Sequence, residues 1–298
     1  MRKTILAATL ALTLCAPAFA ATNALGLDST LNMLTFGDFS VPWSDVEGRV
    51  AVGGNASISN YSINLITAGA PGAALTVGGN LAFMGGTIHG DVIVGGAYTN
   101  NGSGTVTGKV TSGQGFDFAT ERTRLTQLSS RIDLQANTGS VKDEWGTLVF
   151  DASANANGIN VFDVNAADVA KNLKLTGLGN SGTVIINVHG NSVDFGSHGY
   201  MFFDTARGQV LFNLVDAMQV SAGYVEGSIL APKATFNTGS GVIWGQVVAQ
   251  SWSGGTQVNN AAFKGELSVA AVPEPQSYAM LLAGLALMAA VARRRNRA

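Results

Sequence analysis

The sequence has little charge and almost no cysteine. Of its 298 residues, 12% are charged and one, Cys15, is a cysteine. Charged residues make up about a quarter of an average soluble protein, so most of this surface must be neutral. Outside the N-terminal segment that holds Cys15, the chain has no thiol for a disulfide or a cysteine nucleophile. We therefore expect packing and backbone hydrogen bonds to stabilise the fold.

Basic residues are scarcest in the body of the chain. Six of the 17 Lys and Arg residues and one of the 19 Asp and Glu residues lie in the two terminal segments. The body then keeps 11 basic and 18 acidic residues, a net charge of −7. An acidic body without a basic patch argues against nucleic acid as a partner.

The N-terminus has the layout of a secretory signal peptide over residues 1–20. Arg2 and Lys3 precede an apolar segment at residues 5–15, and small residues follow it. This order predicts export through the translocon and cleavage by signal peptidase. A lipoprotein acylated at Cys15 is the alternative, but the preceding Leu14 is too large for a good acylation motif. The predicted cleavage site comprises Ala18, Ala20 and Ala21.

The C-terminal residues 272–298 combine a proline-rich triplet, an apolar run at 278–291 and a cluster of arginines. At ~1.5 Å per residue, the run spans only about 21–23 Å of a ~30 Å hydrocarbon core, which makes it a marginal membrane helix. Arginines after such a run hold the end of the chain in the cytoplasm. The triplet is Pro273, Glu274 and Pro275, and the cytoplasmic stop is Arg293, Arg294, Arg295 and Arg297.

This tail resembles the PEP-CTERM sorting signal of Gram-negative bacteria. The resemblance implies an intermediate held at the inner membrane by the tail, and processing near residues 273–275 by an exosortase, a membrane transpeptidase. The mature protein would then reach the cell surface or the extracellular matrix. An ordinary C-terminal membrane anchor is the alternative.

A repeat of the form x-Gly-x-[Val/Ile]-x-[Val/Ala] predicts the fold of residues 21–271. Gly90 and Gly108 lie eighteen residues apart, and so do Gly227 and Gly245. Strands of about five residues that return at this interval fit the coils of a β-solenoid, which stack to share one core. Glycine pairs such as Gly53-Gly54 would form the corners, because glycine adopts positive φ without steric cost. A β-sandwich with glycine-rich hairpins is the alternative.

One segment departs from this β pattern. Residues 116–135 contain no Gly or Pro, and their apolar residues follow a helical stripe that includes Leu125, Leu128 and Ile132. Asp117 is a suitable N-cap. We predict a mainly β fold, a β-solenoid with one long amphipathic helix packed alongside it and a C-terminal hydrophobic helix.

The body also resembles a known family, the choice-of-anchor A domain. Residues 36–40 and 44–55 are similar to its opening, and residues 227–232, 245–249 and 263–265 to its close. The strands at 183–188 and 210–214 fit the region between. The family is described as an adhesive domain of exported bacterial proteins. Residues 227–232 and the single helix also resemble the ice-binding β-solenoid proteins.

These observations favour an exported, non-catalytic protein of the cell surface or biofilm matrix that adheres to exopolysaccharide or surface glycans. His89, His189 and His198 have no metal-ligand spacing, so we expect no metal, no cofactor and no catalytic residue. A solenoid-type carbohydrate-active enzyme is the alternative, because the sequence does not exclude a pair of carboxylates. Ice binding is a further alternative, although Thr105-x-Thr107 is the one clean Thr-x-Thr motif. Candidate adhesive aromatics are Trp43, Trp145, Trp244, Trp252, Tyr61, Tyr98, Tyr200 and Tyr224.

Overall fold

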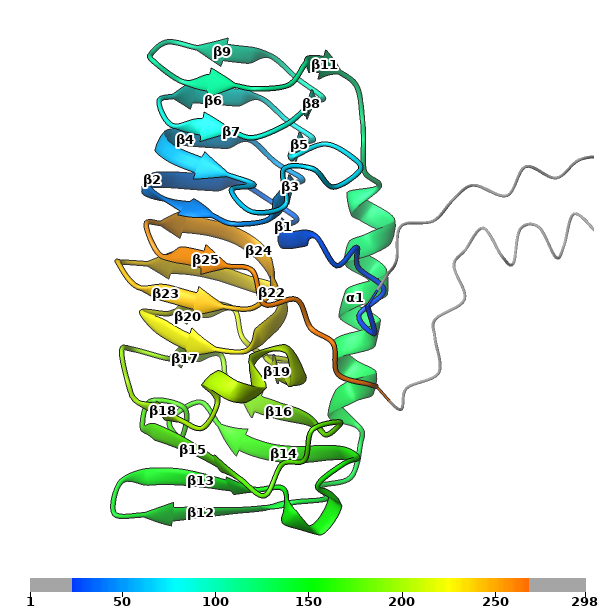
Figure 1. Cartoon of the computed structure of the whole chain (residues 1–298), viewed down its shortest axis with the longest axis vertical. Helices are drawn as coiled ribbons and strands as arrows, with labels where there is room; N and C mark the ends of the chain where they lie inside the picture. The colour runs from blue at the N-terminus through cyan, green and yellow to red at the C-terminus, as the bar shows by residue number, and fades with distance from the viewer. Residues whose placement is uncertain (1–22, 268–298) are drawn as a thin grey trace, which may run out of the picture.

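The computed structural model describes residues 23–267, which form a mainly β body with a parallel sheet curled into stacked coils (Figure 1). The predicted signal peptide, C-terminal helix and sorting residues lie outside this range. Of the helices in residues 23–267, none is long and apolar enough to cross a membrane.

The first part of the chain builds the upper coils in Figure 1. Its strands are β1 (Leu31–Thr35), β2 (Phe39–Val46), β3 (Arg49–Val52), β4 (Ala56–Ile63), β5 (Leu75–Val77), β6 (Leu81–Met84), β7 (Thr87–Ile88), β8 (Val92–Val94), β9 (Tyr98–Asn100), β10 (Thr105–Val106) and β11 (Val110–Ser112).

Helix α1 (Phe118–Asp133) then carries the chain down one side of the molecule to its other end. The helix begins where predicted, because the Asp117 carboxylate accepts a hydrogen bond from the backbone N–H of Thr120 at 3.1 Å. Leu125, Leu128 and Ile132, three residues of the predicted stripe, are buried.

The second part of the chain climbs back up in further coils. It comprises β12 (Ser140–Glu144), β13 (Thr147–Asp151), β14 (Ile159–Asn165), β15 (Asn172–Thr176), β16 (Thr183–His189), β17 (Ser192–Asp194), β18 (Tyr200–Met201), β19 (Val210–Asn213), β20 (Gln219–Ser221), β21 (Tyr224–Glu226), β22 (Ser228–Thr238), β23 (Val242–Trp244), β24 (Val247–Gly254) and β25 (Gln257–Asn259), with short 3₁₀ helices η1 (Ser153–Asn155) and η2 (Asp204–Gln209).

The two parts meet at β1, which pairs in parallel with β3 on one side and with β24 on the other. The order of coils in space therefore differs from their order in the sequence. Within residues 23–267, β12 with β13 is the one antiparallel pairing described, which does not fit a sandwich of hairpins. These two strands, with β15 and β18, form a separate four-stranded sheet at the lower end (Figure 1).

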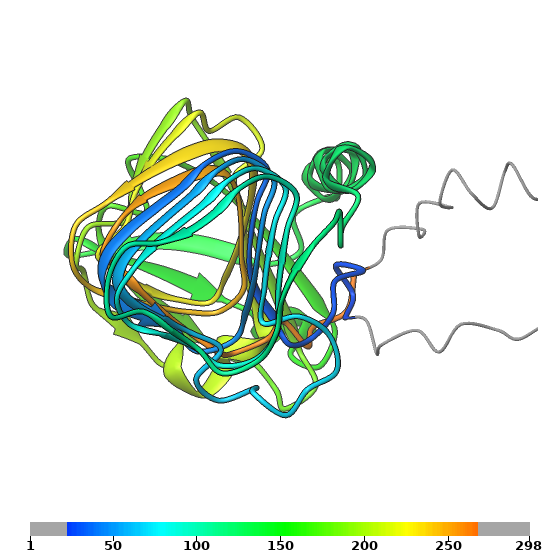
Figure 2. The ribbon, with the colours of Figure 1, turned by 90° about the horizontal axis from the view of Figure 1, so that it is seen from above.

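Viewed along the axis, the coils are roughly triangular and α1 lies outside one side (Figure 2). We call that side the helix side. The next side along the chain is the open face, formed by β17, β20, β6, β9, the second halves of β22 and β24 and the first halves of β2 and β4. The third side contains β21, β23, β25, β7, β10 and the remaining halves of β2 and β4.

The coils enclose a core of aliphatic and phenylalanine side chains, and a second apolar layer lies between the helix side and α1. The second layer includes Leu34, Leu211, Leu230 and Val248 from the strands. The first halves of β22 and β24, on the helix side, are therefore apolar on both faces, whereas strands of the open face alternate, as in Phe39-Ser40-Val41.

Eighteen residues is one of several coil lengths. Val92 pairs with Val110, eighteen residues on, but Val50 pairs with Leu75, 25 residues on. The longer interval contains the loop between β4 and β5. Insertions at the corners therefore hide the repeat from simple spacing arguments.

Candidate functional site

The open face presents its strands directly to solvent with a regular polar surface. In β2, Phe39 and Val41 are buried whereas Ser40 and Pro42 are exposed. The same alternation recurs in β4, where Ala56 is buried and Ser57 is exposed. Because strand side chains alternate across a sheet and the coils are in register, outward residues from successive coils form ranks.

The first rank is formed mostly by small hydroxyl and amide side chains. Strand pairing places Ser40 between Ser57 on one side and Ser253 on the other. Neighbouring strands lie ~4.8 Å apart, so the rank presents one such group at about that interval. From top to bottom it contains Thr99, Ala82, Ser57, Ser40, Ser253, Asn237, Ser221 and Asp194.

A second rank runs alongside the first, two positions earlier in each strand. It contains Ala97, Asn80, Asn55, Asp38, Ser251, Thr235, Gln219 and Ser192. Neither rank contains Lys or Arg, and Asp38 and Asp194 are their charged members. The face is therefore almost neutral although the body as a whole is acidic.

Side-chain oxygens fix the corner from which the upper part of this second rank projects. The Asp38 carboxylate accepts a hydrogen bond from the backbone N–H of Asn55 at 2.8 Å, and the side-chain Oδ1 of Asn55 accepts one from the backbone N–H of Asn80 at 2.9 Å. The Asn80 side chain accepts the N–H of Ala97 at 2.8 Å. Each of these hydrogen bonds joins one coil to the next, so the corners stack in line.

The glycine pairs stand at these corners for a reason other than the one predicted. Gly53, Gly54, Gly78 and Gly79 do not have positive φ. Instead, the backbone of the neighbouring coil occupies the space of a side chain: a Cβ on Gly79 would lie 2.7 Å from both Gly54 O and Asn55 Oδ1. The prediction of corner glycines was correct, but the positive-φ explanation was wrong for these pairs.

The candidate aromatics divide into exposed and packed residues. Trp43 and Trp145 are strongly exposed, and both have positive φ, 46° and 54°. Tyr61 and Trp252 are buried in the core. The other four are partly or largely buried: Tyr98 and Tyr200 pack against the core, Tyr224 contacts Tyr200, and Arg207 stacks over Trp244 with its guanidinium carbon 3.9 Å from the ring centroid.

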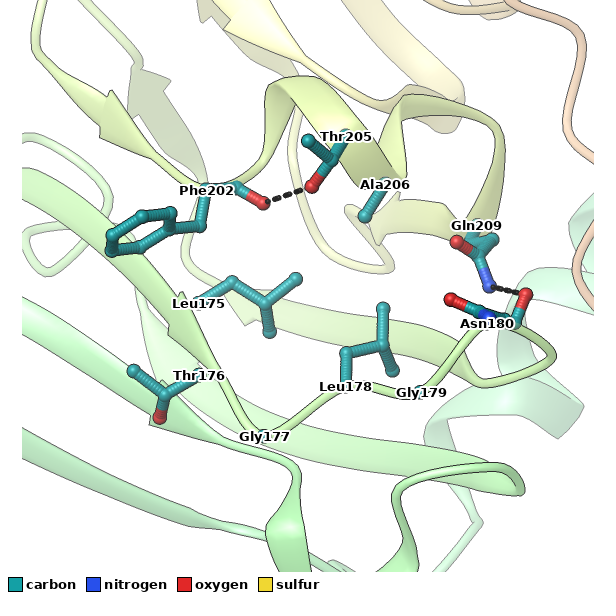
Figure 3. Close-up of a pocket in the computed structure, with 10 residues that line it drawn as sticks. All are labelled: Leu175, Thr176, Gly177, Leu178, Gly179, Asn180, Phe202, Thr205, Ala206 and Gln209. Atoms are coloured by element: carbon teal, nitrogen blue, oxygen red, sulfur yellow. Dashed lines mark hydrogen bonds between the residues drawn. The ribbon is translucent and has the colours of Figure 1, made fainter.

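A depression of 390 Å³ lies between the end of β15 and η2 (Figure 3). Its lining includes Leu175, Leu178, Phe202 and Gln209, and Figure 3 shows Gln209 hydrogen-bonded to the backbone oxygen of Asn180. None of its lining residues is acidic, basic or histidine. The pocket therefore supplies neither a general acid nor a general base.

A second depression contains two carboxylates, Asp28 and Glu121, but both are already paired. Asp28 lies 2.7 Å from Arg49, and Glu121 forms an ion pair with Arg124 on the same helix. Burial alone would raise the pKa of Asp28, but hydrogen bonds from Thr30 and the charge of Arg49 lower it. The ion pair with Arg49 therefore favours the ionised form of Asp28 and is structural, unlike the general acid of a glycosidase, whose pKa is raised.

The predicted site residues all belong to the two terminal segments. The cleavage residues Ala18, Ala20 and Ala21, the triplet at 273–275 and the arginines at 293–297 lie outside the described residues. The two ranks of the open face were missed from the sequence. Their members come from coils of different lengths, so no fixed spacing relates one to the next.

Residues 24–260 match the family model described as "Putative Ice-binding-like adhesive domain". The chain belongs to this family. Residues 271–295 match the model of the PEP-CTERM protein-sorting motif. Both matches confirm the resemblances drawn from the sequence. An adhesive-type domain followed by this motif indicates an exported surface protein of the ice-binding-like adhesive family.

No curated protein matches the chain significantly. Among solved structures, the chain is similar to an ice-binding protein from an Antarctic ascomycete, Antarctomyces psychrotrophicus. That match has 13% sequence identity and a TM-score of 0.28, and it covers 83% of this chain and 100% of the other.

Proposed function

We propose that this protein is a non-catalytic adhesin of the cell surface or extracellular matrix, with a β-solenoid body that binds through the open face. The observation that carries the proposal is the pair of polar ranks from Thr99 to Asp194, almost free of charge and not covered by α1. Such an exposed, ordered array repeats similar polar groups at a fixed interval, which suits a ligand built of repeating units.

Polysaccharides fit the chemistry of this face. Hydroxyl and amide groups both donate and accept hydrogen bonds, as sugar hydroxyls do. A rigid array loses little conformational entropy on binding, because its side chains are short and already placed. The exposed Trp43, at the corner where β2 leaves the open face, adds an aromatic surface on which a sugar ring can stack. The ligand class is therefore exopolysaccharide or surface glycan.

The proposal includes the absence of catalysis. The pocket in Figure 3 has no titratable lining residue, and the two carboxylates of the second depression are ion-paired. The alternative, a carbohydrate-active enzyme, requires an unpaired acid and base across a cleft. This alternative is tested by incubating the protein with the polysaccharides that it binds and measuring new reducing ends. Any released oligosaccharide would support the enzyme hypothesis.

Binding by the open face is tested with two matched double variants on a glycan and matrix-polymer array. Ser40→Lys/Ser57→Lys places two charges on paired strands of the open face. Thr87→Lys/Thr105→Lys places the same charges on paired strands of the third side. We expect the first pair to lose binding at least tenfold and the second to bind as the unmodified protein does. Equal loss in both variants would contradict the assignment to the open face.

We further propose that an exosortase processes the tail near Pro273, Glu274 and Pro275 after export. Replacing all three residues by alanine should leave export intact but keep the protein in the inner-membrane fraction, with its arginine tail present by intact mass. Normal release of this variant to the surface would refute processing at the triplet.

Ice is a second candidate ligand, favoured by the regular hydroxyl spacing of the first rank and by the family description. The rank is less uniform than a threonine array, because Ala82, Asn237 and Asp194 interrupt it. Measurement of thermal hysteresis with the purified protein distinguishes the two ligands. A freezing-point depression that is lost in Ser40→Lys/Ser57→Lys would favour ice over a glycan.

A further inference from the structure

A group of metal-ligating side chains lies where the C-terminal end of α1 meets the strands of the helix side. Asp133 is the last residue of α1, Asp163 lies in β14 and His189 ends β16. One ligand atom from each lies within 4.8 Å of the others. Asp216, after β19, completes the group from the opposite side of the imidazole ring.

The two nitrogens of His189 face different carboxylates. Nε2 lies 3.5 Å from Asp133 Oδ1 and 3.9 Å from Asp163 Oδ1. Nδ1 lies 3.6 Å from Asp216 Oδ2. A metal-binding histidine commonly has this arrangement: one nitrogen faces the ion, and the other is oriented by a carboxylate that fixes the tautomer.

We propose that Asp133, Asp163 and His189 bind a divalent transition-metal ion such as Zn²⁺, and that Asp216 orients His189. Four-coordinate zinc has bonds of about 2.0–2.1 Å to nitrogen and oxygen, so neighbouring ligand atoms lie roughly 3.3–3.4 Å apart. The 3.5 Å distance from Nε2 to Asp133 is close to this value, and the 3.9 Å distance to Asp163 exceeds it by about half an ångström, which side-chain rotation can close. Water would supply the remaining position.

A buried oxygen within the group also supports the proposal. Asp133 Oδ1 is inaccessible to solvent and makes no hydrogen bond, although His189 Nε2 lies 3.5 Å away. A buried carboxylate oxygen without a hydrogen bond is costly, and a bound cation is a common reason for its retention. Three carboxylates, those of Asp133, Asp163 and Asp216, lie around the one imidazole. A doubly charged ion would offset this crowding of negative charge.

Surrounding amides hold the ligands in place. Asn187 donates to Asp163 Oδ1 at 2.9 Å, and Asn213 donates to Asn187 Oδ1 at 2.9 Å. Ser129 of α1 donates to Asn213 Oδ1 at 2.6 Å. These residues form the polar end of a column on the helix side that continues upward as Leu230, Val248, Leu34 and Ala51.

The donor set selects the class of ion. Imidazole nitrogen with carboxylate oxygens suits Zn²⁺ and related ions, whereas Ca²⁺ prefers six to eight oxygen ligands. The bound ion would join α1 to β14 and β16, because Asp163 and His189 lie thirty or more residues after Asp133 in the sequence. The site is thus a structural clamp for the lower end of the helix. The sequence led us to expect no metal site, because ligands on separate coils have no recognisable spacing.

The test uses exported protein purified from its host, stripped with chelator and titrated with Zn²⁺ by calorimetry, with Co²⁺ absorption as a second readout. We expect one ion per chain and a thermal midpoint that rises with Zn²⁺. His189→Gln and Asp163→Asn should weaken binding at least a hundredfold, and Asp216→Asn about tenfold. His198→Gln, a matched change outside the group, should bind normally.

Both ligand side chains to be changed are partly exposed, so these variants should fold, and circular dichroism checks that they do. A tetrahedral Co²⁺ spectrum that disappears in His189→Gln supports the site. No binding by the unmodified protein, binding insensitive to His189→Gln, or a stronger response to Ca²⁺ than to Zn²⁺ would each overturn it.

Discussion

At the scale of single residues, close contact between coils governs the composition. Gly54, Gly79 and Gly96 have no room for a side chain, because the backbone and the Asp38, Asn55 or Asn80 side chain of the adjacent coil fill it. The abundance of glycine was visible in the sequence, and so was its position at corners. The reason was not, since stacking contacts depend on which coils are neighbours.

Close stacking at the corners predicts a loss of stability when one methyl group is added there. In Gly79→Ala the new Cβ would lie 2.7 Å from Gly54 O, so the coil must shift, and we expect the free energy of unfolding to fall by about 1–3 kcal/mol. Gly69 has no atom within 4 Å of its Cβ position, so Gly69→Ala is the matched control and should not destabilise the protein. Urea unfolding of both variants measures the difference. Equal stability would show that the corners are not tightly stacked.

At the scale of elements, the helix was the most predictable part and the arrangement of coils the least. The apolar stripe and Asp117 placed the helix within two residues of its observed ends. Nothing local indicated that α1 carries the chain from one end of the body to the other, or that β1 lies between β3 and β24. The grouping of His189 with Asp133 was missed for the same reason, because it depends on contacts between distant segments.

Docking of α1 is tested by a charge on its buried face. Leu128 is 5% exposed and belongs to the apolar layer between helix and strands. Leu128→Asp removes that packing and buries a carboxylate, so we expect a loss of about 3–5 kcal/mol in unfolding free energy. Gln127→Asp, on the exposed side of the same turn, should change it by less than about 0.5 kcal/mol. If Leu128→Asp and Gln127→Asp have the same thermal midpoint, the helix does not stabilise the body.

At the scale of the whole molecule, the export signals accompany a charge-poor polar surface. The composition already indicated a neutral surface, and the terminal motifs indicated secretion. The structure adds where the neutral polar groups gather: on the open face, in two ranks that run through both parts of the chain. Because the coils of both parts contribute, the face exists only in the assembled body.

The most direct test of this account is the attachment of host cells to a polysaccharide-coated surface under flow. The gene is replaced by the open-face variant Ser40→Lys/Ser57→Lys or by the third-side variant Thr87→Lys/Thr105→Lys, at equal surface levels. We predict that open-face cells detach like cells lacking the protein, whereas third-side cells remain attached like the parent strain. Firm attachment of the open-face cells would contradict the claim that this face makes the protein an adhesin.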